Sequence, residues 1–205
     1  WIWHDYLMES YNIQLIFPCL IHQYFYKSIK KKDIINFAYQ LKKDDPKGVS
    51  KSNQGGWHSN PINITTDNII SDTLKIGLWG SVFSSFKEDT PIDIAYWINI
   101  NPPKSYNITH THPNCDLSGV LWIKIPKNSG HFIFESPYSH SSHQEINSYQ
   151  ENIKENSNNY STMNYVPVEG KMLTFSSHMP HRVNQNNSNQ DRISISYNVK
   201  ILPHN

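Results

Sequence analysis

The fold is decided by the stretch Asn107-Ile-Thr-His110-Thr-His112-Pro-Asn114-Cys-Asp116, which runs directly into Leu117-Ser-Gly-Val-Leu-Trp-Ile-Lys-Ile125. The first part concentrates side chains that can bind a metal ion. The second part is an apolar and β-branched run that is typical of a buried strand. Residues at i and i+2 of an extended segment point to the same face, so His110 and His112 can reach one metal ion.

The same strand-like pattern continues through the C-terminal half of the chain. Five runs show it: Ile92–Ile100, Leu117–Ile125, His131–Glu135, Lys171–Phe175 and Arg192–Ile201. In the last run, alternation places Arg192, Ser194 and Ser196 on one face and the apolar residues between them on the other. The sequence therefore predicts a β structure over about residues 91–201, in which a cation and a hydroxyl face the same way.

Residues 1–90 show a different pattern, in which helical periodicity dominates. Ile13–Phe25 is apolar with a central proline and predicts an edge strand. Ser28–Lys43 predicts one amphipathic helix, and a second, broken helix follows the capping cluster Thr65-Thr66-Asp67. The stretch Gly48–Asn63 between the helices predicts a loop. We therefore expect one domain spanning 1–205, mainly β (α+β), with N-terminal helices that support a jelly-roll or barrel.

A polar segment interrupts the β half. Residues 138–164 are rich in Ser, Asn, His and Gln and show almost no apolar periodicity. Two interpretations remain open for this tract, a mobile lid or a disordered insertion.

Composition excludes several classes of function. The 18 Lys and Arg nearly balance the 17 Asp and Glu, giving a net charge of +1, so no nucleic-acid partner is indicated. No apolar run is long enough for a membrane span. Two cysteines, Cys19 and Cys115, provide no disulfide framework and indicate a reducing compartment, so we expect a cytoplasmic protein. The apolar Trp1-Ile-Trp3 leaves room for a homodimer contact.

Further candidate site residues lie near the C-terminal end. The segment Gly170-Lys-Met-Leu-Thr-Phe-Ser-Ser-His-Met-Pro-His181 contains a turn, an apolar strand and a histidine beyond it. His181 and His178, three residues earlier, are both candidates for a further ligand. Arg192 is a further candidate site residue, although an ion pair with Asp191 or a loop carboxylate would give it a purely structural role.

Nine short motifs together resemble a known family. They are Trp97-Ile-Asn99, Tyr106-Asn107, His110-Thr-His112-Pro113, Leu117-Ser-Gly-Val120, Phe134-Glu135-Ser-Pro137, Glu169-Gly170, Phe175, Pro180-His181-Arg-Val183 and Arg192-Ile-Ser194. The chain resembles the Fe(II)/2-oxoglutarate-dependent oxygenases, most closely the oxygenase family of this type found in marine bacteria and cyanophages. The resemblance runs from about Ile13 to Val199.

This resemblance implies a prolyl-hydroxylase-like double-stranded β-helix with one iron in its mouth. It implies Fe(II) bound by His110, His112 and His181, with 2-oxoglutarate and O2 as cosubstrates and succinate and CO2 as products of the hydroxylation. In the family pattern an Asp usually stands where this chain has His112, so Asp116 is kept as an alternative ligand to His112. Both alternatives stay open from the sequence.

The resemblance also implies roles in cosubstrate binding. Arg192 would hold the distal carboxylate of 2-oxoglutarate, with Ser194 as a hydroxyl donor. Trp122 would form part of the pocket wall, and Asn107 would be a further cosubstrate-binding residue. The substrate is not indicated and could be a small molecule or a protein side chain.

Two rival functions remain open from the sequence. One is a cupin-type metalloenzyme that uses the histidines without 2-oxoglutarate. The other is a non-enzymatic jelly-roll binding module, since jelly-roll folds host many functions.

Overall fold

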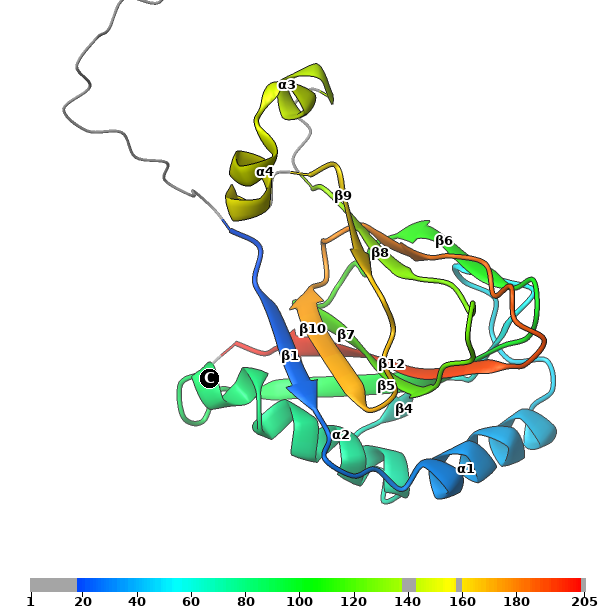
Figure 1. The fold of residues 1–205 in the computed structure, drawn as a ribbon. Coiled ribbons are helices and arrows are strands. Elements are labelled where there is room, and N and C mark those ends of the chain that lie inside the picture. Colours follow the sequence, from blue (N-terminus) through cyan, green and yellow to red (C-terminus); the bar gives the residue numbers. More distant parts are fainter. Residues whose placement is uncertain (1–17, 138–142, 158–159, 204–205) are drawn as a thin grey trace, which may run out of the picture.

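The computed structural model describes residues 18–137, 143–157 and 160–203 of the chain, and these form two antiparallel sheets that face each other (Figure 1). The larger sheet contains, in spatial order, β1 (Ile21–Phe25), β10 (Lys171–Ser176), β7 (Leu117–Lys124), β12 (Arg192–Ile201), β5 (Ile92–Asn101) and β3 (Trp57–His58), and β4 (Ile62–Asn63) also pairs with β5. The smaller sheet contains β2 (Asn53–Gln54), β6 (Tyr106–His110), β11 (His181–Val183), β8 (Phe132–Glu135) and β9 (Thr162–Tyr165). The predicted mainly β architecture is confirmed.

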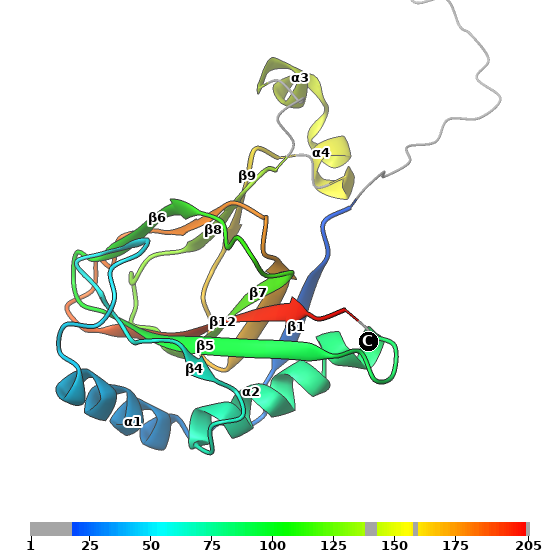
Figure 2. The same cartoon turned by 180° about the vertical axis from the view of Figure 1, so that it is seen from behind.

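Two helices cover the outer face of the larger sheet, away from the smaller sheet (Figures 1 and 2). The first is α1 (Lys31–Asp44), close to its predicted span. The second, α2 (Ile69–Trp79), begins later than predicted, because Asn68 is the cap: its side-chain oxygen accepts from the backbone N–H of Ile70 and Ser71. A short 3-10 helix, η1 (Val82–Ser85), follows the break at Gly80.

Alternation along the two central strands separates the hydrophobic core from the interior of the barrel. Outward-facing side chains of β5 and β12, such as Ile98 and Ile195, are fully buried against the helices. The intervening residues, including Trp97 and Arg192, face the space between the sheets. The predicted alternation along Arg192–Ile201 is therefore confirmed, and it places polar groups inside the barrel.

A second, aromatic cluster closes the barrel between the two sheets. It contains Val120, Trp122, Phe132, Phe134, Leu173, Phe175 and Met179, all of them buried. Phe132, Phe134 and Phe175 lie against the ring of His181. One end of the barrel is thus filled with apolar side chains, and the polar residues occupy the other part of the interior.

The predicted loop Gly48–Asn63 contains three short strands, and the loop prediction was wrong there. Trp57 is buried and its indole N–H donates to the backbone oxygen of Asp45, which anchors the segment. Pairing with β5 and β6 then supplies backbone partners that local sequence patterns do not reveal. This segment becomes one wall of the site described below.

The described part of the polar tract 138–164 forms regular elements, which does not fit a disordered insertion, and the mobile lid stays a prediction. Within its described residues it forms α3 (His143–Ser148), α4 (Glu151–Ser157) and β9, which pairs with β8. Lys154 and Glu151 form an ion pair of 2.8 Å across one turn of α4. Both helices stand beyond β9, away from the body of the barrel (Figure 1). Residues 138–142 and 158–159 lie outside the described residues.

The N-terminal predictions are tested only in part. The edge strand is confirmed for Ile21–Phe25, which pairs with β10 at the border of the larger sheet. Residues 18–20 are described but form no strand, so the prediction was wrong there. Residues 13–17 lie outside the described residues, as does the expected dimer contact at Trp1–Trp3. Among the described helices, none combines the length and the apolar character that crossing a bilayer requires.

Candidate metal centre and its pocket

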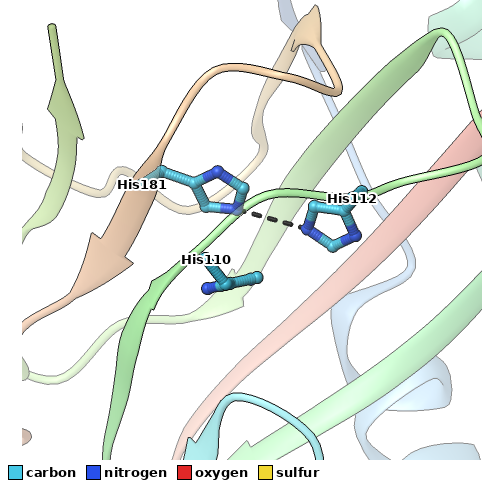
Figure 3. Close-up of side chains that lie close together, drawn as sticks. All are labelled: His110, His112 and His181. Carbon is cyan, nitrogen blue, oxygen red and sulfur yellow. Dashed lines mark hydrogen bonds between the residues drawn. The ribbon is translucent and has the colours of Figure 1, made fainter. Parts of the chain in front are cut away.

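Three histidines meet at the mouth of the barrel (Figure 3). His110 ends β6 and His181 begins β11, and these two residues are register partners on neighbouring antiparallel strands. His112 lies just beyond the end of β6, and its Nε2 is 3.3 Å from Nε2 of His181. One potential ligand atom from each residue lies within 4.8 Å of the others. Two nitrogens bound at about 2.1 Å to one metal ion lie roughly 3.0–3.4 Å apart, so the observed separation suits a shared ion.

Backbone carbonyls determine the tautomers of two of these rings. Nδ1 of His110 lies 2.7 Å from the backbone oxygen of Ile108, and Nδ1 of His181 lies 2.9 Å from that of Met179. A carbonyl oxygen can only accept, so each Nδ1 carries the proton and each Nε2 keeps a lone pair. Histidines that ligate a metal are commonly oriented by this arrangement.

Burial keeps the three imidazoles neutral. Desolvation, with a smaller contribution from neighbouring His110, lowers the pKa of His112 to about 4 and that of His181 to about 3. Desolvation also lowers the pKa of His110 below its ordinary value. A neutral imidazole is the form that binds a metal, so no proton has to be removed at neutral pH. The donor set therefore fits Fe(II), for which imidazole is a suitable ligand.

Stacked aromatic rings support His112. The indole of Trp97 stacks on His112 with ring centroids 5.6 Å apart. The ring of His58 also stacks on Trp97, with centroids 5.3 Å apart. Nδ1 of His58 donates to the backbone oxygen of Ser59 at 2.6 Å. Sequence reasoning did not place His58 at the site, whereas it is 8% exposed and lines the site. The only signal in the sequence that could have indicated a site role for His58 is the neighbouring Trp57 within a turn-rich stretch.

Arg192 is buried inside the barrel and only 2% exposed. One guanidinium nitrogen, Nη1, donates to the backbone oxygens of Ser129 and Asn184. The other, Nη2, is buried without a hydrogen-bond partner among the described residues. Burial lowers the pKa of Arg192 to about 10, so the group stays charged at neutral pH. Among the described residues no carboxylate, Asp191 included, forms an ion pair with Arg192. The carboxylate of Asp191 instead accepts from the hydroxyl of Tyr39 at 2.7 Å.

The histidines and Arg192 line one pocket of about 750 Å³. Its walls include the other residues singled out in the sequence, Ser194, Trp122 and Asn107. The amide of Asn107 donates to the hydroxyl of Ser52 at 3.1 Å, so it lies on the side of the β2 segment. A buried arginine with a free donor indicates an anion-binding end, because an unpaired buried cation is energetically costly. The pocket thus combines an end that could hold a metal ion with an end that could hold an anion.

Two alternative ligands lie outside this arrangement. The carboxylate of Asp116 accepts from the backbone N–H of Ile201 at 2.7 Å, which ties the turn to the end of β12. It does not belong to the histidine group and does not line the pocket. His178 is exposed and is likewise outside the group. Among the described residues, the three imidazoles are therefore the group at this site that could hold a metal ion.

Comparison with known proteins identifies the chemistry. A family model described as "Putative 2OG-Fe(II) oxygenase" matches residues 95–198, slightly more than half of the chain. This segment contains the three histidines, Arg192, and the pocket residues Trp97 and Trp122. A search of curated protein sequences finds no match.

Three solved structures share the fold at low sequence identity. A prolyl-4-hydroxylase from Pseudomonas putida is 13% identical with a TM-score of 0.54, covering 89% of this chain and 93% of its own. HygX from Streptomyces hygroscopicus, solved with nickel and 2-oxoglutarate, is 11% identical with a TM-score of 0.57, covering 84% and 80%. A prolyl hydroxylase from Trichoplax adhaerens, solved with a peptide of hypoxia inducible factor, is 11% identical with a TM-score of 0.55, covering 83% and 78%.

These findings agree with the double-stranded β-helix expected from the sequence. They decide against the two rival functions, a cupin-type enzyme that does not use 2-oxoglutarate and a non-enzymatic module. Iron and 2-oxoglutarate are accordingly the cofactor and the cosubstrate. The matched segment, the shared fold and the histidine cluster lead to one conclusion: the chain belongs to the 2OG-Fe(II) oxygenase family.

Proposed function

We propose that this protein is an Fe(II)- and 2-oxoglutarate-dependent dioxygenase that hydroxylates its substrate and releases succinate and CO2. One atom of O2 enters the succinate and the other enters the hydroxyl group of the product. O2 is the oxidant, and 2-oxoglutarate and the substrate each supply two of the four electrons that reduce it. The observation that carries the proposal is that one pocket joins three neutral imidazoles to a buried arginine with a free donor.

In this proposal His110, His112 and His181 hold the iron. The backbone acceptors of His110 and His181 direct Nε2 of both rings toward the ion, and Trp97 holds the ring of His112 by stacking. When bound, the iron supplies the site at which 2-oxoglutarate chelates and dioxygen reacts. Three neutral ligands give the centre one more positive charge than the usual two histidines and one carboxylate would.

Arg192 binds the distal carboxylate of 2-oxoglutarate in this scheme. Its Nη1 is already occupied by two backbone oxygens, which fixes the plane of the guanidinium. Nη2 then remains for a charge-assisted hydrogen bond to the carboxylate. Ser194, two residues along the same face of β12, adds a hydroxyl at this end of the pocket, and Trp122 forms its wall.

The remaining part of the pocket would receive the substrate. One wall of this part is formed by the segment around β3, which contributes Lys51, Ser52, His58 and Asn60. No Asp or Glu is among the residues that line the described pocket. A cationic substrate would therefore find no counter-ion there, and we infer a neutral or anionic substrate. Succinate formation stimulated by an amine but not by its matched carboxylic acid would contradict this inference.

Anaerobic titration tests the proposed function directly. Fe(II)-loaded protein mixed with 2-oxoglutarate in the absence of O2 should develop the weak visible band of a metal-chelated 2-oxo acid. Admission of O2 should then yield succinate and CO2 in equal amounts. Protein that binds Fe(II) but shows neither the band nor any 2-oxoglutarate binding would overturn the proposal.

A further inference from the structure

Asn101 and Arg192 are direct neighbours at the anion-binding end of the pocket. Asn101 is the last residue of β5 and Arg192 the first residue of β12, and the two are register partners. Both line the pocket, and each is 2% exposed. Cross-strand partners on the same face have Cβ atoms roughly 5 Å apart, so both side chains can reach one small group between them.

These two residues carry the only unpartnered buried side-chain nitrogens or oxygens in the described part of the chain. They are Nδ2 of Asn101 and Nη2 of Arg192. A buried donor without an acceptor destabilises a protein, so two such donors side by side are unusual. By contrast Asn99, two residues earlier on the same face, donates to the hydroxyl of Ser196 at 3.0 Å. The missing acceptor is therefore local to Asn101 and Arg192.

We propose that Asn101 is a second binding residue for the distal carboxylate of 2-oxoglutarate, beside Arg192. A carboxylate has two oxygens and accepts several hydrogen bonds, which matches one amide donor and one guanidinium donor. This inference rests on the proposed function, in which Arg192 holds the same carboxylate. It makes Asn101 a residue that selects 2-oxoglutarate over 2-oxo acids that lack a distal carboxylate.

Gly56 permits this position of the amide. A Cβ at residue 56 would lie 2.5 Å from Nδ2 of Asn101, so any larger residue would displace that group. The backbone of Gly56 does not adopt the left-handed conformation that side chains disfavour. Gly56→Ala therefore changes the space beside the amide without straining the backbone, and it offers a way to perturb Asn101 that leaves its chemistry intact.

The experiment compares two 2-oxo acids on the same variants. Metal-loaded, anaerobic protein is titrated with 2-oxoglutarate and with 2-oxobutyrate, which lacks the distal carboxylate, and binding is followed calorimetrically. Asn101→Ala should weaken 2-oxoglutarate binding at least about tenfold, since a hydrogen bond to a charged group is lost. Its affinity for 2-oxobutyrate and for the metal should stay within about twofold of wild type, which also shows that the variant is folded.

Gly56→Ala provides an independent test of the role of Asn101. It should weaken 2-oxoglutarate binding in the wild-type background, and it should have no further effect in the Asn101→Ala background, where the methyl group has room. Equal losses for both 2-oxo acids would indicate a structural role or a bound water and would overturn the inference. Unchanged 2-oxoglutarate affinity in Asn101→Ala would overturn it too, while leaving the proposed function intact. Only wild-type protein that fails to bind 2-oxoglutarate would overturn the proposed function.

Discussion

His110 and His181 are directly opposite each other on the antiparallel strands β6 and β11, and their ring centroids lie 4.3 Å apart. The pairing register alone brings these two residues together. A shift by one residue would turn one of the two rings to the outer face of the sheet. The position of both imidazoles is thus a property of the sheet, and His112 completes the group from the adjoining turn.

His181→Asn should abolish tight Fe(II) binding, because it removes the most buried ligand of the three. Equilibrium dialysis followed by elemental analysis measures the change. His178→Asn is the matched control, since His178 is exposed and outside the cluster, and it should bind metal as wild type does. Loss of the metal in the control but not in His181→Asn would reverse the assignment of the ligand.

Arg192→Met should weaken 2-oxoglutarate binding by about a hundredfold and leave Fe(II) affinity nearly unchanged. The expected loss follows from removing a charge-assisted contact in a buried pocket. Anaerobic calorimetry with 2-oxoglutarate gives the affinity. Arg182→Met serves as the control, because Arg182 pairs with Glu135 at 3.0 Å and does not line the pocket. Equal losses of metal and 2-oxoglutarate affinity in Arg192→Met would contradict the role assigned to Arg192.

Trp97→Leu should weaken Fe(II) binding by about tenfold, the scale of effect known for residues that orient metal ligands. Among the described residues no backbone oxygen accepts from Nδ1 of His112, so the ring depends on its stacking against Trp97. Competition with a fluorescent chelator measures the affinity. Trp79→Leu, which alters an exposed tryptophan of α2, should have no effect. Wild-type affinity in Trp97→Leu would show that the stack does not position His112.

The metal-free protein should lose stability as the pH falls from about 6.5 toward 3. Burial lowers the pKa of His181 from 6.5 to about 3, so over this range the unfolded chain binds a proton that the folded chain does not. Above pH 6.5 neither state binds this proton, so His181 does not lower the free energy of unfolding there. At pH 5 it lowers the free energy of unfolding by about 2 kcal/mol, at about 1.36 kcal/mol per pH unit.

Urea denaturation at pH 7 and pH 5 checks this sign and size. His181→Asn should reduce the difference in unfolding free energy between the two pH values. His178→Asn should leave that difference as it is in wild type. Stability that rises toward pH 5, or a His181→Asn variant with an unchanged difference, would contradict the burial of a neutral imidazole.

Several elements could be predicted from local patterns because local physics forms them. The span Arg192–Ile201 was predicted to the residue, since alternation along a half-buried strand is visible in the sequence. Helix α1 was predicted within three residues for the same kind of reason. The segment Gly48–Asn63 was not, because its short strands exist only through pairing with β5 and β6. His58 was missed as a site residue for that reason. Asn101 was missed because it lies one residue beyond the predicted run Ile92–Ile100.

The sequence by itself determined the class of the fold, the polar inner face of β12 and the ligand candidates, because periodicity and residue chemistry are local properties. Only the tertiary structure decided that Asp116 is tied to Ile201, that His178 is exposed, and that Arg192 lies beside Asn101 with free donors. These relationships join residues far apart in the chain. They depend on strand register and burial, which no single stretch of sequence contains.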